Sequence, residues 1–238
     1  MKHTTKNQLL LLFIVALLSS CGEPPKKAII PMDTVEYASL TAELSNDVLI
    51  QQDSLAVNFQ LRNFLRAFSN PDNAKESNGE YQSENLPKEI DKPFPKNKML
   101  LIISEQEQTI FKEKYLGHTL YLVNSTNAAI DFSAQDSKLS IYIEAFTKSG
   151  TWKPISYMPS SFCGNSYHKI TLDTNEYWQF RIPVFTGDYK TKIRYALSLD
   201  QETKLVSNEI EAYINLDQFD KNKQQGNSSE NIMNPYSN

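Results

Sequence analysis

Cysteine is scarce in this sequence, because its 238 residues include only Cys21 and Cys163. Cys21 directly follows an apolar segment, where its thiol is the one nucleophile available for attachment of a lipid. If Cys21 is used in that way, no intramolecular disulfide can form and the fold depends on its apolar core. An exposed lone thiol would cross-link in an oxidising compartment, and we therefore expect Cys163 to be buried.

Basic charge and histidine are also limited. The sequence has 24 Lys and Arg against 28 Asp and Glu, and it has three His. Such a mildly acidic chain has no general reason to bind nucleic acid. Too few histidines and thiols are present for a spaced zinc motif, and no loop has the ligand pattern of an EF-hand. Asp131 and Asp136 could contribute to a calcium loop but are also typical turn residues. We predict no metal and no other cofactor.

Long hydrophobic runs are lacking as well. The longest runs from Leu9 to Leu18, and it is preceded by Lys2 and Lys6 without an acidic residue. At about 1.5 Å per residue, a helix of this length is too short to cross a hydrocarbon core of roughly 30 Å. Its length and its basic flank are those of a secretory signal. The sequence therefore predicts a signal peptide over residues 1–20.

The end of this run, Leu18-Ser19-Ser20-Cys21, resembles a bacterial lipobox. The resemblance implies cleavage before Cys21, acylation with a chain such as palmitate, and attachment to the bacterial outer membrane. The alternative is an ordinary secreted protein whose cysteine happens to lie at the cleavage site. Residues 21–33 contain two adjacent prolines and two lysines, which indicates a solvated, fairly stiff tether. Only Glu23 is an acid close to the anchor, so the periplasmic and the cell-surface face both stay open.

The remaining sequence has the two-residue periodicity of β-strands. Residues 34–68 alternate apolar and polar side chains, and they form either part of the main domain or a small separate β module. Residues 69–98 are rich in Asn, Ser, Glu, Lys and Pro, which indicates a solvated loop or linker. The strand pattern is continuous over residues 99–219. It is lost over residues 220–238, which we predict to be a disordered tail.

In residues 99–219, short strand patterns separated by turn residues follow one another without helical patterns. This arrangement predicts an all-β, antiparallel sandwich. The side chains expected to point inward from the two clearest strands are Trp178, Phe180, Ile182, Val184, Ile193, Tyr195, Leu197 and Leu199. Phrases such as Trp152-Lys153-Pro154-Ile155 and Phe162-Cys163-Gly164-Asn165 are similar to Ig-like β-sandwich lipoproteins of unassigned function from Bacteroidota. The resemblance implies an Ig-like sandwich in the cell envelope, and it brings no catalytic residues.

Few residues are candidates for catalysis. Cys163 and His168 are five positions apart, which in an extended chain is far more than the ~3 Å between a thiol and its base. Ser166, His168 and Asp173 are the residue types of a hydrolase triad, but no nucleophile elbow surrounds the serine. We predict no catalytic residues and no enzyme activity.

A basic pattern predicts a binding face. Lys190, Lys192 and Arg194 alternate along one predicted strand and therefore share its outward side. Arg181 and Tyr177 alternate on the preceding strand, which would place them beside the three cations across a turn. Such a face would suit an acidic partner loop, an anionic glycan or lipid head groups. A solvated sheet face would contain the same residue types.

Trp152 is expected at a hairpin tip and is the better candidate of the two tryptophans for exposure. The lipobox-like stretch, the basic face and Trp152 together predict a lipid-anchored envelope protein. It would act as a non-catalytic binding or assembly module for an envelope protein. The alternative is a glycan-binding accessory lipoprotein of an outer-membrane uptake system. A platform of rings around Trp152 would favour the glycan, and a flat apolar patch rimmed by cations would favour the protein.

Thr34 and Ser54 each follow an acid and precede an aliphatic residue, a pattern that resembles O-glycosylation acceptors of Bacteroidota.

Overall fold

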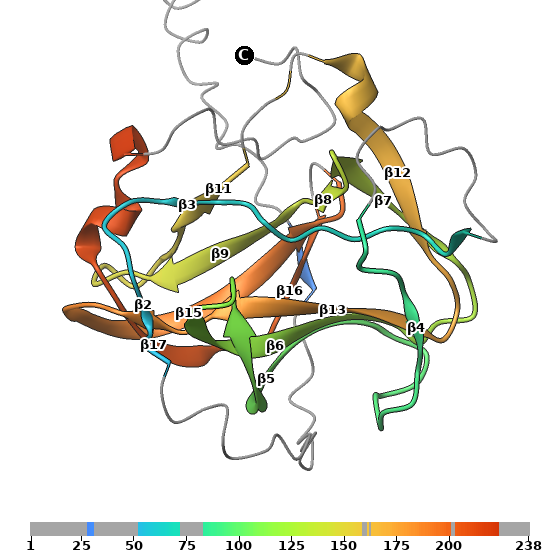
Figure 1. The fold of residues 1–238 in the computed structure, drawn as a ribbon, viewed down its shortest axis with the longest axis horizontal. Helices are drawn as coiled ribbons and strands as arrows, with labels where there is room; N and C mark the ends of the chain where they lie inside the picture. Colours follow the sequence, from blue (N-terminus) through green and yellow to red (C-terminus); the bar gives the residue numbers. More distant parts are fainter. Residues whose placement is uncertain are drawn as a thin grey trace, which may run out of the picture.

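The computed structural model describes residues 28–30, 52–71, 83–158, 161, 163–200 and 203–223 (Figure 1). The predicted signal peptide, Cys21, Thr34 and residues 224–238 of the predicted tail lie outside these ranges. Within them, no helix has the length and apolar character needed to cross a membrane.

The largest sheet consists of β1 (Ala28–Ile30), β9 (Ile141–Phe146), β10 (Trp152–Pro154), β15 (Tyr189–Ser198), β16 (Thr203–Val206) and β17 (Ile210–Ile214). Its order is β1-β16-β15-β9-β10, and β17 also pairs with β15. All pairs are antiparallel except β1 with β16. On one side of β15, the first half of the strand pairs with β17 and the second half with β16. On its other side β15 pairs with β9, so this one long strand joins three neighbours.

A second sheet has the order β4-β13-β6-β5 and contains β4 (Lys88–Glu89), β5 (Met99–Phe111), β6 (Tyr115–Asn124) and β13 (Glu176–Pro183). β5 lies at its edge and contains a bulge between Ser104 and Gln108. The Asn208 side chain accepts a hydrogen bond from Ile103 N (2.7 Å) and donates one to Ile103 O (3.0 Å). Its amide thus occupies the position that a neighbouring strand would take at this edge.

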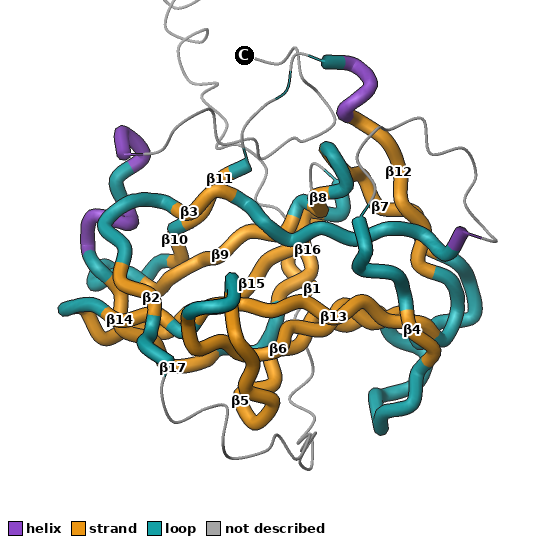
Figure 2. Tube along the Cα trace, viewed as in Figure 1, coloured by secondary structure: helices purple, strands orange, loops and turns teal. Residues whose placement is uncertain are grey.

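A third sheet, of order β12-β7-β8, contains β7 (Ile130–Gln135), β8 (Lys138–Leu139) and β12 (Tyr167–Leu172). Two parallel pairs complete the strands: β2 (Leu55–Ala56) with β14 (Phe185–Thr186), and β3 (Leu61–Arg62) with β11 (Ser156–Tyr157). Short 3-10 helices are η2 (Gly164–Ser166), η3 (Leu216–Phe219) and η4 (Lys221–Lys223). Figure 2 shows these helical turns at the periphery. η4 falls where the sequence predicted the start of the tail.

Side chains from all of these sheets meet in one core. It contains Leu120 from β6, Ile143 from β9, Ile170 from β12 and Tyr195 from β15, together with Leu61 from β3. Residues 52–68 therefore contribute to the same core as the strands that follow. The structure confirms the predicted antiparallel all-β sandwich, and the Ig-like assignment stays a prediction from the sequence.

The predicted inward side chains of β13 and β15 are buried. The six that are no more than 4% exposed are Trp178, Phe180, Ile182, Ile193, Tyr195 and Leu197, whereas Val184 and Leu199 are half-buried. The indole of Trp178 donates a hydrogen bond to Phe68 O at 3.0 Å. This contact ties the segment after β3 to the centre of the fold.

The outer face of the β4-β13-β6-β5 sheet is covered by residues 90–95, which the sequence predicted to lie in a solvated loop. Phe94 is 6% exposed and packs edge-on against Tyr121 and Tyr177, with ring centroids 5.3 and 5.7 Å away. Lys92 pairs with the buried Glu107 at 2.9 Å, and Glu107 also accepts a hydrogen bond from Tyr121. The solvated-loop prediction is wrong here because both faces of this sheet are apolar and the segment shields the second one.

Candidate functional site

A groove lies on the outward face of the largest sheet, over β9, β10, β15 and β17. Its volume is about 410 Å³, large enough for part of a small ligand. Aromatic rings and charged side chains share its lining, which consists of Phe146, Trp152, Tyr189, Lys190, Thr191, Lys192, Glu209 and Glu211. We call it the aromatic groove.

The β9–β10 hairpin positions the two main rings. Its turn is closed by hydrogen bonds from Thr147 N to Thr151 O (2.8 Å) and from Gly150 N to Thr147 O (3.0 Å). Gly150 has φ +79°, a conformation that a residue with a Cβ adopts only with strain. Phe146 and Trp152 are register partners, so their side chains lie on the same face with ring centroids 5.2 Å apart.

Charged side chains support Trp152 from below. The guanidinium carbon of Arg194 lies 4.2 Å from the centroid of the indole. Glu144 accepts hydrogen bonds from Arg194 Nε and from Lys204 Nζ, both at 2.7 Å. The side chains of these three charged residues are 6–12% exposed. Trp152 is therefore stacked on a cation that is itself held by a buried carboxylate.

The predicted basic face is neutralised by carboxylates from other strands. Lys190 and Lys192 are exposed on the same side of β15, as expected, but they pair with Glu211 at 3.1 Å and with Glu209 at 3.0 Å. The hydrogen bond to Glu211 raises the pKa of Lys190. A net basic surface at these positions was a wrong prediction, because Glu211 on β17 and Glu209, which directly precedes β17, supply one acid for each exposed lysine.

Two further residues of the predicted face lie elsewhere. Tyr177 and Arg181 are on β13, which pairs with β6 and β4 and not with β15. Tyr177 is 2% exposed and packs against Phe94 and Tyr121. Its hydroxyl donates a hydrogen bond to Asp91 at 3.1 Å. Burial raises the pKa of Tyr177 to about 12. Arg181 is exposed and lines a different groove, so the predicted proximity to Lys190 is wrong.

The candidates for catalysis around η2 differ in their exposure. Cys163 is exposed, contrary to the prediction, because it precedes η2 at the outer end of β12. The buried Ser166 hydroxyl accepts a hydrogen bond from Ser161 at 2.9 Å. His168 Nδ1 is 3.3 Å from Ser166 O, and its Nε2 is buried without a partner among the described residues.

The aspartates considered for calcium also have protein partners. Asp131 accepts a hydrogen bond from Thr171 at 2.7 Å, and Asp136 lies 3.5 Å from Lys138. Across the ranges that the structure describes, no cluster of three or more His, Cys, Asp or Glu side chains is arranged to hold a metal ion.

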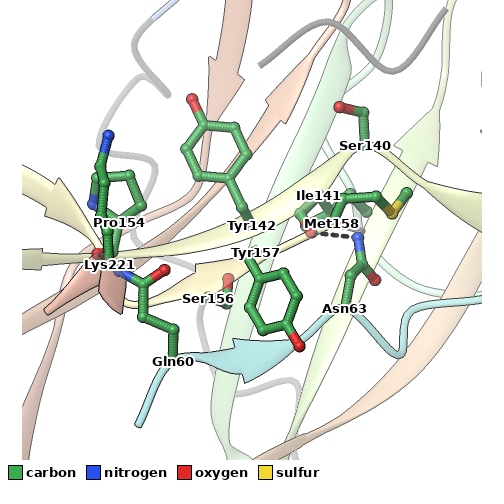
Figure 3. A pocket seen from close by; sticks show the side chains of 10 residues that line it. All are labelled: Gln60, Asn63, Ser140, Ile141, Tyr142, Pro154, Ser156, Tyr157, Met158 and Lys221. Atoms are coloured by element: carbon green, nitrogen blue, oxygen red, sulfur yellow. Dashed lines mark hydrogen bonds between the residues drawn. The ribbon is translucent and has the colours of Figure 1, made fainter. Parts of the chain in front are cut away.

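A second, narrow pocket lies where residues 60–63 cross β9 and β11 (Figure 3). Its volume is about 40 Å³, room for little more than a water molecule. Asn63 Nδ2 donates to Leu139 O (2.7 Å) and to Ile141 O (2.8 Å), and Gln60 Nε2 donates to Pro154 O (3.2 Å). These amides hold the N-terminal segment against the sheet, which identifies the pocket as a structural contact.

Sequence reasoning found Trp152, Lys190, Lys192 and Arg194 but missed the residues that surround them. Phe146, Glu144 and Lys204 gave no signal, because each is an ordinary strand residue until the sheet is assembled. Glu209 and Glu211 did give a sequence signal, since they alternate along the last predicted strand in the same manner as the lysines.

No protein-family model, curated protein or solved structure matches the chain.

Proposed function

We propose that this chain is a lipid-anchored cell-envelope protein whose β domain is a non-catalytic binding or assembly module at the outer membrane. The lipobox-like Leu18-Ser19-Ser20-Cys21 supports the anchor, and the aromatic groove supports ligand binding. Ala28, the first residue of β1, is seven positions after Cys21 in the sequence. An extended chain spans at most about 3.6 Å per residue, so the start of β1 lies within about 25 Å of the acyl group on Cys21. The domain therefore acts close to the membrane.

A glycan is the ligand that the aromatic groove supports best, and the single observation behind it is the stacking of Trp152 on Arg194. The indole is fixed before the ligand arrives, so stacking a sugar ring on its other side costs little conformational entropy. Phe146 adds a second ring, and the Lys–Glu pairs supply donors and acceptors with no net charge. These features favour a neutral saccharide, and hence a glycan-binding accessory lipoprotein, over an acidic protein loop.

The anchor is tested by Cys21→Ala in the native host. We expect the full-length protein to move from the membrane fraction to the soluble fraction and to lose labelling by a palmitate analogue. Ser20→Ala keeps a small residue before the cysteine and is the matched control, which should remain in membranes. Unchanged fractionation of Cys21→Ala would exclude the lipid anchor and leave the groove proposal intact.

The groove is tested by titrating neutral cello-, xylo-, malto- and manno-oligosaccharides into the full-length protein in detergent. We expect at least one series to bind, and Trp152→Ala to weaken that binding by about tenfold or more, as is typical of a central aromatic contact. Phe59→Ala removes another exposed ring that does not line the groove and should bind like the wild type. Absence of binding to all four series, or equal loss in both variants, would contradict a glycan ligand.

A further inference from the structure

Three of the four arginines in the chain lie on a part of the molecule that the proposed function does not use. Arg62 and Arg66 belong to the segment that starts with β3, and Arg181 is on β13. Arg66 and Arg181 line one groove of about 630 Å³ together with Lys88. We call it the arginine groove. The fourth arginine, Arg194, is buried beneath Trp152.

The cations of this groove have little compensation. Glu84 is the only acid among its described lining residues, which together have a net charge of +2. Neither guanidinium forms an ion pair with any described residue, whereas both exposed lysines of the aromatic groove do. All three cationic residues are exposed and open to a ligand.

The surroundings reinforce the positive potential. Lys138 is 6% exposed and lies opposite Arg66 in an isolated β-bridge. Its pKa is lowered, first by burial and then by repulsion from Arg66 and Arg62, and Asp136 at 3.5 Å offsets this only in part. An anion bound at Arg66 would therefore relieve repulsion that already exists in the folded protein.

The segments that carry the cations are joined to one another by hydrogen bonds. Asn85 Nδ2 donates a hydrogen bond to Arg66 O at 3.0 Å, which joins the segment before β4 to the one after β3. Lys88 Nζ lies 3.2 Å from Gln179 Oε1, which joins β4 to β13 two residues from Arg181. Three segments distant in sequence thus present their charges from a cross-linked backbone, and binding needs to order only the side chains.

We propose that the arginine groove binds a phosphate group. Planar guanidinium groups match phosphate oxygens in a bidentate geometry, and two of them face one groove here. A phosphomonoester carries a charge of about −1.5 to −2 at neutral pH, which complements the lining charge, whereas a single carboxylate would leave part of it uncompensated. The phosphate belongs to a soluble phosphomonoester or to a lipid whose head group is a phosphomonoester, as in phosphatidic acid, and both present the same three oxygens to the arginines.

The test uses the full-length protein in neutral detergent micelles and two probes. Inorganic phosphate is titrated in solution, and phosphatidic acid, whose head group is a phosphomonoester, is added to the micelles in separate titrations, each followed by isothermal calorimetry. We expect saturable binding in at least one arm, and about tenfold or more weaker binding in Arg66→Gln/Arg181→Gln. Binding of phosphate identifies a soluble ligand, and binding of phosphatidic acid alone identifies a lipid head group.

The matched control is Lys190→Gln/Lys192→Gln, which removes the same charge from the aromatic groove and should bind the probe like the wild type. Arg181→Lys keeps the charge but loses the guanidinium fork, and we expect intermediate affinity. Circular dichroism establishes that each variant is folded. Absence of binding in both arms, or equal weakening in the two double variants, would overturn the proposal without affecting the glycan proposal.

Discussion

The aromatic groove and the arginine groove both contain exposed basic side chains, but only one of them is basic. In the aromatic groove each exposed lysine lies within 3.1 Å of a glutamate on β17 or directly before it. In the arginine groove, two guanidinium groups share the lining with one acid among the residues that the structure describes. The comparison shows that cations along one strand do not establish a surface potential, because the neighbouring strand determines whether they are neutralised.

The grooves also differ in what lies beneath them. Beneath Trp152 of the aromatic groove lies a buried ion triad in which Glu144 holds Arg194 and Lys204. The arginine groove is held by peripheral hydrogen bonds such as Asn85 to Arg66 and Lys88 to Gln179. We therefore expect stability to depend strongly on charges under the first groove and weakly on those around the second.

The largest effect is expected from Glu144→Gln, which leaves two largely buried cations without a counter-charge. Loss of one member of a buried ion network should lower the free energy of unfolding by about 3 kcal/mol or more. Urea denaturation followed by circular dichroism measures it. Glu211→Gln is the matched control, because that side chain is 70% exposed, and it should change stability by less than about 1 kcal/mol. Similar values for both variants would remove the distinction between the two grooves.

A second variant should make the aromatic groove resemble the arginine groove. Glu209→Gln/Glu211→Gln removes the acids that neutralise Lys190 and Lys192, so this surface should gain affinity for phosphate of about tenfold. Isothermal calorimetry with inorganic phosphate measures the gain. Asp53→Asn/Glu113→Gln makes the same change in net charge outside both grooves and should have little effect. An equal gain in the two variants would show that net charge alone controls binding.

Alkaline pH should affect the segment that carries Lys88 of the arginine groove. Tyr177 has a pKa of about 12 in the folded protein, whereas an unfolded tyrosine ionises near about 10. The stabilisation from neutral, buried Tyr177 is therefore complete below pH ~10 and is lost as pH rises toward ~12. The urea midpoint should fall over this interval, and less steeply in Tyr177→Phe. An identical decline in the variant would contradict a contribution from this hydroxyl.

The smallest effect is expected from Lys192→Ala. Its ion pair with Glu209 joins side chains that are 60% and 42% exposed, so water screens it and unfolding should change by no more than about 1 kcal/mol. Urea denaturation at low salt measures the change, and glycan affinity should change more than stability if the pair contributes hydrogen bonds to the ligand. A loss above about 2 kcal/mol would indicate that this pair belongs to the structural network beneath Trp152.

Some of these features were predictable from local pattern. Trp178, Phe180 and Ile182 alternate with polar residues, and a half-buried strand buries one side of such a pattern whatever its neighbours are. Phe94 was not predictable, because a single ring in a polar segment gives no period, and its burial depends on the apolar outer face of another sheet. The burial of Cys163 was predicted from redox chemistry, and the side chain is exposed. The redox state of a compartment disfavours an exposed thiol but does not determine where packing places it.

The sequence by itself determined that this is a β protein, which residues face its core, and that Lys190, Lys192 and Arg194 share one side of a strand. Only the tertiary structure decided that the first two are neutralised and that the third supports Trp152. The reason is that alternation is a property of one strand, whereas an ion pair requires two. Glu144 and Arg194 are 50 residues apart in the chain, and the pairing of β9 with β15 brings them to 2.7 Å.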